Sequence, residues 1–85
     1  MKTVEYTIKD ELGLHARPAG LFVKEAVKNP CKVTLSKGAK NADAKKIFSV
    51  MGLGVKCGDT VCITCDGDGE DAAADALLAL LQANV

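Results

Sequence analysis

The stretch Gly13-Leu14-His15-Ala16-Arg17-Pro18-Ala19 marks the point where a polar loop turns into a helix. Beyond it, apolar residues recur at the spacing of one buried helical face, at Ala19, Phe22, Val23 and Ala26. This pattern predicts a helix from about residue 16 to 28, closed by Asn29-Pro30, because the residue before a proline avoids helical geometry. His15, the only histidine of the chain, is therefore expected at or beside the N-cap. Pro18 fits in the first turn, where its missing N–H costs little.

The start of this helix is expected to attract an anion. Its first N–H groups have no intrahelical acceptor, and the helix dipole is positive at this end. Arg17 adds a planar, permanently charged group that suits phosphate oxygens. The same positive surroundings disfavour imidazolium, so we expect the ring to be largely neutral at about pH 7, with a nucleophilic nitrogen. The pattern indicates a phosphoryl group carried on His15, although an isolated histidine is more often a packing or capping residue.

Length and composition limit the remaining possibilities. With 85 residues, the chain is expected to form one domain, residues 1–85. Its 11 basic and 11 acidic residues balance, which argues against binding nucleic acid through net charge. No apolar run approaches the roughly 20 residues of a membrane span, and the N-terminus lacks the apolar core of a signal peptide. The cytoplasm is therefore the expected location.

Four cysteines, at positions 31, 57, 62 and 65, raise the possibility of disulfides. Without a secretory signal, reduced thiols that pack as small apolar residues are the expected state. Cys62 and Cys65 form a C-x-x-C string, but it falls in a strand pattern that would direct the two sulfurs to opposite faces. No metal site is expected, because a single histidine leaves too few ligands for zinc.

The rest of the chain alternates between strand and helix patterns. Period-two alternation predicts strands at 3–8, from Cys31 to 36, near 40–44 and at 60–66. A short helix is expected over 46–53, with Phe48 exposed because that helix has few core positions. A last helix should run to about residue 82 and cover the sheet with Ala74, Leu77, Leu78 and Leu81.

The acidic stretch from Asp66 to Asp71 only superficially resembles a calcium loop. Its spacing puts Asp71 where the loop needs glycine and Leu77 where it needs a chelating glutamate. We interpret it instead as a turn whose Asp68, Glu70 and Asp71 cap and charge-stabilise the last helix.

Together these elements give the order βαββαβα. Strands with one polar face favour an antiparallel sheet covered on one side, so the predicted fold class is α/β (α+β), an open-faced two-layer sandwich with three helices on one face of four strands. The pattern alone does not give the strand order.

The Gly13–Ala19 string closely resembles the active-site string of the histidine-containing phosphocarrier (HPr) family of the bacterial phosphoenolpyruvate-dependent sugar phosphotransferase system. Chain length, the position of the histidine, the segment from Lys46 to Gly54 and a final helix also agree with that family. The resemblance implies strand order 1-4-2-3. It also implies that enzyme I phosphorylates the δ nitrogen of His15, which passes the group to the A component of a sugar permease. Arg17 would neutralise the group, and the N–H groups of Ala16 and Arg17 would hold its oxygens.

Such a protein is a carrier rather than an enzyme, needs no cofactor, and is expected to be a monomer. The resemblance favours a partner-binding surface made of Gly20, Leu21, Lys24, Ile47, Phe48 and Met51. Ordinary core positions remain an alternative for Ile47 and Met51. Gly20 departs from the Ala or Thr more usual at its position.

Lys46 occupies the position where many Gram-positive members carry a serine phosphorylated by an ATP-dependent kinase. Lysine has no hydroxyl, so we expect this regulation to be absent at Lys46, and the nearby Ser49 does not match the kinase position. Two other functions stay open. One is a family paralogue that serves a transcriptional regulator or a non-sugar kinase. The other is a small-molecule-binding regulatory module in which His15 is only a cap.

Overall fold

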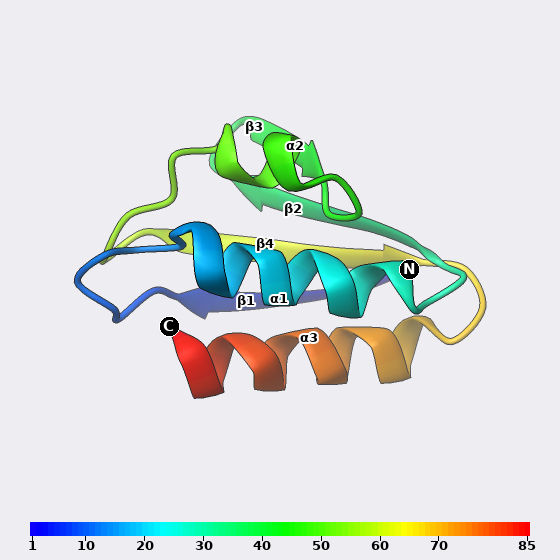
Figure 1. Ribbon diagram of the computed structural model, residues 1–85. Helices are drawn as coiled ribbons and strands as arrows, with labels where there is room; N and C mark the ends of the chain where they lie inside the picture. The colour runs from blue at the N-terminus through cyan, green and yellow to red at the C-terminus, as the bar shows by residue number, and fades with distance from the viewer.

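The computed structural model describes all 85 residues and has the predicted order βαββαβα (Figure 1). The elements are β1 (Lys2–Thr7), α1 (Ala16–Val27), β2 (Lys32–Lys37), β3 (Lys40–Asp43), α2 (Ile47–Met51), β4 (Thr60–Asp66) and α3 (Glu70–Asn84). No helix combines the length and the apolar character needed to cross a membrane.

The four strands form one antiparallel sheet in the order β1-β4-β2-β3. Figure 1 shows α1 and α3 running along one face of this sheet, with α2 beside β2 and β3. Alternation along β4 explains the two-layer arrangement, because Val61 and Ile63 are fully buried while Thr60 is exposed and Thr64 only half-buried. The predicted open-faced sandwich and its strand order are confirmed.

One apolar core lies between the helices and the sheet, and Phe22 of α1 is its largest fully buried side chain. The predicted stripe on α3 is right for Ala74, Leu77 and Leu81 but wrong for Leu78, which is only half-buried. Ala73 is buried instead, because the inward face of α3 centres on Leu77 and takes the residues four before and four after it.

The two later helices begin differently from the sequence prediction. α2 is shorter than expected and starts after Lys46, whose side chain makes no capping hydrogen bond. α3 starts after Gly69, which adopts φ +75°, so Asp68 is not its cap. Glu70 provides a predicted acidic side chain at the start of α3, and its carboxylate accepts a 3.2 Å hydrogen bond from the N–H of Gly67.

All four cysteines are free thiols. Cys65 is fully buried and Cys62 half-buried, as expected if their side chains leave opposite faces of β4. Burial raises the pKa of the Cys65 thiol to about 11, and the neighbouring Cys31 thiol adds to the shift. The contact between Cys31 and Cys65 was not foreseen, because it joins positions that are far apart in the sequence.

Candidate functional site

His15 lies at the N-cap of α1, as predicted, with extended backbone angles of φ −82° and ψ −178°. Its side chain makes no capping hydrogen bond to the helix, so the imidazole does not serve as the cap. The side chain is 35% exposed, which leaves the ring open to a partner. The alternative in which His15 is only a capping residue therefore finds no hydrogen bond to support it.

The loop before His15 is shaped by Gly13. This residue has φ +66°, and its N–H donates to the carbonyl of Asp10 at 2.9 Å, closing a four-residue turn. A Cβ at Gly13 would overlap the carbonyl oxygen of Val55 and lie 2.7 Å from Cα of Lys56. Leu14 is buried and donates its N–H to the same Val55 carbonyl at 3.1 Å. The segment after α2 therefore fixes the backbone that leads into the histidine.

The first turn of α1 presents two free donors. The N–H groups of Ala16 and Arg17 donate to no backbone or side-chain acceptor, whereas the N–H of Ala19 bonds the carbonyl of His15 at 2.9 Å. Arg17 is exposed and takes part in none of the ion pairs of the structure. The helix start thus carries uncompensated positive charge beside the ring, which suits an anion.

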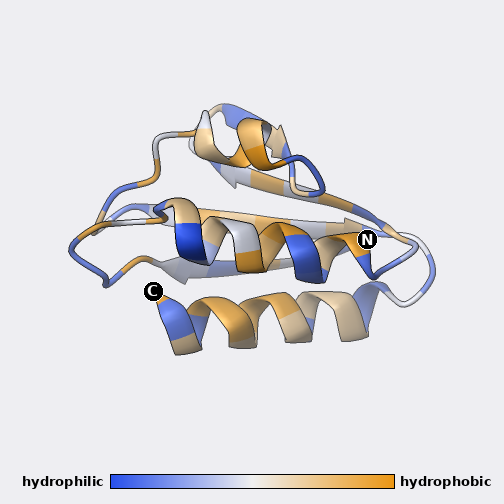
Figure 2. Cartoon of the chain, viewed as in Figure 1, coloured by the Kyte–Doolittle hydropathy of each residue, from blue (hydrophilic) through white to orange (hydrophobic).

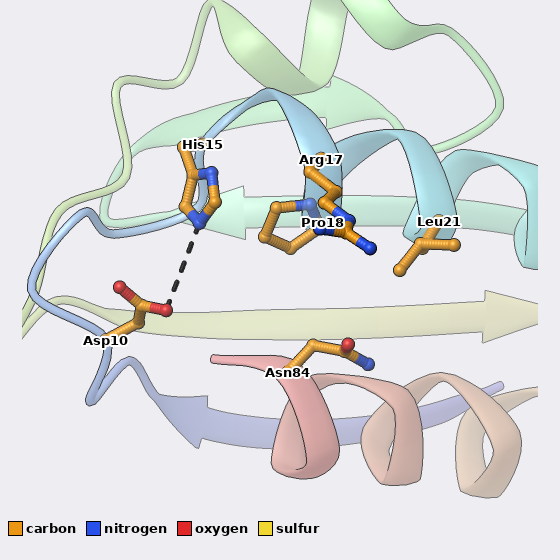
Figure 3. A pocket seen from close by; sticks show the side chains of 6 residues that line it. All are labelled: Asp10, His15, Arg17, Pro18, Leu21 and Asn84. Atoms are coloured by element: carbon orange, nitrogen blue, oxygen red, sulfur yellow. Dashed lines mark ion pairs between the residues drawn. The ribbon is translucent and has the colours of Figure 1, made fainter.

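An open hollow of about 260 Å³ adjoins the ring, and its lining residues are Asp10, His15, Arg17, Pro18, Leu21 and Asn84 (Figure 3). In this view the Arg17 guanidinium lies beside Pro18 on the side nearer Leu21, rather than over the imidazole. A phosphoryl group on the ring would therefore meet the N–H groups of the helix start first, and Arg17 would reach it by turning its exposed side chain.

Asp10 is the residue of this hollow that the sequence did not single out. Its Oδ2 lies 3.9 Å from Nε2 of His15, and no other ion pair involves the histidine (Figure 3). A signal was present, because aspartate at the first and glycine at the fourth position are typical of a type I turn. That signal predicts the turn, but the approach to His15 depends on the path of the chain after Gly13.

The residues predicted to bind partners fall on two helices that pack against each other, α1 and α2. Phe48 is 88% exposed, as expected, and Leu21 and Met51 are 42% and 39% exposed. Gly20 and Lys24 are also exposed, while Ile47 is half-buried and packs against the core. Figure 2 shows α2 coloured mostly as apolar, although Phe48 and Met51 of this helix are exposed.

The remaining predicted positions lie apart from the ring. Lys46 is exposed at the N-cap of α2, and Ser49 is half-buried in the middle of that helix. No group of three or more His, Cys, Asp and Glu side chains is arranged to hold a metal ion.

Comparison with known proteins places the chain in a family. A family model described as the PTS HPr component phosphorylation site matches residues 2–83. The chain belongs to the HPr family. It is 40% identical over 81 residues to the phosphocarrier protein HPr of Lysinibacillus sphaericus, covering 95% of this chain and 92% of that one.

Solved HPr structures agree with this fold. An HPr from Thermoanaerobacter tengcongensis is 42% identical and has a TM-score of 0.93, covering 98% of this chain and 93% of that one. A dimer of HPr from the same organism superposes with a TM-score of 0.78. The HPr-like protein Crh of Halalkalibacterium halodurans is 37% identical over 81 residues, covering 95% of this chain and 94% of that one. HPr and HPr-like proteins thus resemble this chain to a similar degree.

Proposed function

We propose that residues 1–85 act as one cytoplasmic phosphocarrier domain of the phosphotransferase system. His15 accepts a phosphoryl group from enzyme I, which has itself been phosphorylated by phosphoenolpyruvate, and passes the group to the A component of a sugar permease. The chain is itself a reactant that cycles between an unmodified and a phosphorylated state. It needs no cofactor and no second copy of itself. The family membership supports this proposal, and the arrangement around His15 supplies the chemistry.

One observation carries the proposal most directly. A partly exposed imidazole stands at the start of a helix whose first N–H groups, those of Ala16 and Arg17, are free, and it lines the same open hollow as the Arg17 guanidinium, which has no counter-charge. Preorganised donors of this kind stabilise the charge on a transferring phosphoryl group.

Docking would use the exposed apolar side chains next to this site. Phe48, Leu21 and Met51 present apolar surface on α1 and α2, and exposed Lys24 and Lys46 add positive charge to the same two helices. Gly20 adds no side chain to the exposed surface of α1, and Ile47 is half-buried against the core. An apolar centre with a charged rim is the usual composition of a transient protein interface, and the positive rim favours acidic partner surfaces.

A regulatory role is the second candidate. The similarity to an HPr-like protein named Crh, at 37% identity, favours a partner such as a transcriptional regulator or a kinase in place of a permease component. Both candidates use the same histidine chemistry and differ only in the acceptor. A small-molecule-binding module is disfavoured, because the hollow at His15 is open and lined mainly by polar groups.

The deciding experiment incubates the protein with enzyme I and phosphoenolpyruvate and follows its intact mass. We expect one added phosphoryl group that is labile in acid and stable in base, as a phosphohistidine is. Adding a permease A component should then return the carrier to its original mass, whereas a carrier that serves only a regulator would stay phosphorylated.

The matched control is His15→Ala, which should take up no phosphoryl group and keep its fold. Size-exclusion chromatography with light scattering on the same samples tests the expected monomer. Unchanged labelling of His15→Ala would show that another residue carries the group, and no labelling of either protein would refute the phosphocarrier proposal itself.

A further inference from the structure

We propose that Asp10 is a positioning residue for His15, one that keeps the ring proton on Nε2 and leaves the lone pair on Nδ1. This inference rests on the proposed phosphocarrier function, in which the δ nitrogen of His15 takes the phosphoryl group, and adds the group that keeps this nitrogen free of a proton. The starting observation is that the carboxylate of Asp10 faces Nε2 at 3.9 Å, with both side chains only about one-third exposed, at 32% and 35% (Figure 3).

The turn before His15 holds Asp10 in place through three hydrogen bonds. Its N–H donates to the carbonyl oxygen of Val85 at 2.8 Å, which ties the turn to the end of α3. Its carbonyl accepts the N–H of Gly13 at 2.9 Å, and its Oδ1 accepts the N–H of Leu12 at 2.9 Å. With Oδ1 occupied in this way, Oδ2 is the oxygen that remains for the histidine. A side chain held by its own backbone in this manner is preorganised and needs little ordering when the ring reacts.

A carboxylate beside one ring nitrogen selects between the two neutral forms of imidazole. The proton resides on either Nδ1 or Nε2, and the hydrogen bond or charge next to one nitrogen sets which form is present. An ionised carboxylate only accepts, so Asp10 favours the form with the proton on Nε2. In Figure 3 the other nitrogen, Nδ1, lies on the side of the ring that faces the start of α1. The free N–H groups of Ala16 and Arg17 belong to this first turn of α1.

The distance of 3.9 Å exceeds a hydrogen bond, so the resting contact is electrostatic. Contacts of catalytic groups are often long in the unbound protein and shorten in the reacting complex. The reaction gives a reason for shortening here. When the lone pair on Nδ1 forms a bond to phosphorus, the bond between phosphorus and the donor nitrogen of enzyme I breaks, and its electron pair stays with enzyme I.

The proton on Nε2 remains in place during this transfer, so the imidazole ring gains positive charge. Asp10 faces that charge and stabilises it. When the phosphoryl group leaves for the next acceptor, the electron pair of the P–N bond returns to Nδ1, and the ring becomes neutral again with its proton still on Nε2. The guanidinium and the helix start act on the phosphoryl oxygens, whereas Asp10 acts on the ring. The positive groups thus balance the negative charge on the phosphoryl oxygens, and Asp10 balances the positive charge on the ring.

The test is the substitution Asp10→Asn, which keeps the turn but replaces the hydrogen-bond acceptor that faces the ring with a donor. The amide oxygen of asparagine can still accept the N–H of Leu12, and this leaves the NH₂ group toward Nε2. Because an NH₂ group donates, it favours the wrong form of the ring, with the proton on Nδ1. Glu11→Gln is the matched control, because it removes a carboxylate from the next position of the same turn, where the side chain is exposed and makes no hydrogen bond or ion pair.

The first readout is the pair of ¹⁵N chemical shifts of the His15 ring at alkaline pH, which report the populations of the two neutral forms without any partner protein. We expect the unmodified protein and Glu11→Gln to favour the proton on Nε2, and Asp10→Asn to lose that preference. The second readout is the rate of phosphoryl transfer from enzyme I. Removing one charge 3.9 Å from the ring, with the interaction fully screened by water, corresponds to about a fivefold change in the rate constant. We therefore expect Asp10→Asn to accept the phosphoryl group at least about fivefold more slowly than the unmodified protein.

A structural role for Asp10 would lower the melting temperature without moving the ring shifts. Equal ring populations in all three proteins, or unchanged transfer in Asp10→Asn, would overturn the proposal. If the unmodified protein shows the expected Nε2–H form but accepts no phosphoryl group, the phosphocarrier function fails while the placement of Asp10 stands. The two conclusions are thus tested separately.

Discussion

Substitution of Gly13 by alanine tests whether close backbone contact shapes the loop that carries His15. Gly13 combines φ +66° with a Cβ position that would overlap the carbonyl oxygen of Val55 and lie 2.7 Å from Cα of Lys56. Left-handed backbone costs an L-residue about 1–2 kcal/mol. Forcing extra atoms into a packed site typically costs a further 1–3 kcal/mol or so. We therefore expect Gly13→Ala to lower the free energy of unfolding by about 2–5 kcal/mol.

Gly54→Ala is the matched control, because Gly54 has nearly the same φ of +62° but its Cβ would meet nothing within 4 Å. It should lose only the strain of about 1–2 kcal/mol. Alanine also restricts the unfolded chain, but this contribution is similar in the two variants and cancels in the comparison. The difference between Gly13→Ala and Gly54→Ala thus isolates the overlap with Val55 and Lys56.

Urea unfolding followed by circular dichroism, with thermal melting beside it, measures both variants. In a domain of this size about 1 kcal/mol corresponds to a change of roughly 4–8 °C in melting temperature, so Gly13→Ala should melt at least about 10 °C below the unmodified protein. Phosphoryl transfer to His15 should also be slower, since the same loop places the ring. Equal losses of stability in the two variants would refute the close-packing argument.

Four further outcomes follow from three side chains, Arg17, Lys46 and Asp59. Arg17→Ala should slow phosphoryl transfer with a nearly unchanged melting temperature, because Arg17 is exposed and unpaired; a large drop in the melting temperature would make it structural instead. Lys46→Ser should stabilise the protein by about 1 kcal/mol through a proper N-cap on α2, measured by urea unfolding. The same variant should become a substrate of the serine kinase with ATP, whereas modification of the unmutated protein at any serine would contradict our interpretation of Lys46. The N–H of Lys56 and then the Lys37 ammonium lower the pKa of Asp59 below its usual value of about 4, so its contribution to stability is complete above that value and is lost as the pH falls through the lowered pKa. Unfolding curves of Asp59→Asn and the unmodified protein should therefore converge in acid, and a constant gap at every pH would contradict this.

Local patterns predicted most of the fold because the relevant forces act over short stretches of chain. The position of His15 at the start of α1 follows from the apolar spacing after it, and the exposure of Phe48 follows from the few core positions of α2. The alternation along β4 likewise gives the correct buried residues. The order of the strands came from the family resemblance, since period-two alternation describes one strand and not its neighbours.

The features that were missed depend on contacts between distant segments. Asp10 faces His15 only because Val85, at the end of α3, fixes the turn between them. Leu78 was placed in the core by counting along one helix, but the face of α3 that packs against the rest of the molecule includes Ala73 instead. Asp68 was expected as a cap because acidic residues favour that role, and the left-handed Gly69 took the position. In each case the tertiary arrangement decided between local alternatives of similar energy.

The most direct test of the phosphocarrier proposal is heteronuclear NMR on protein labelled with ¹⁵N and phosphorylated by enzyme I and phosphoenolpyruvate. We predict one ³¹P resonance coupled to Nδ1 of His15, with the proton retained on Nε2. A phosphorus signal coupled to Nε2, or a phosphoryl group attached to any residue other than His15, would contradict the account.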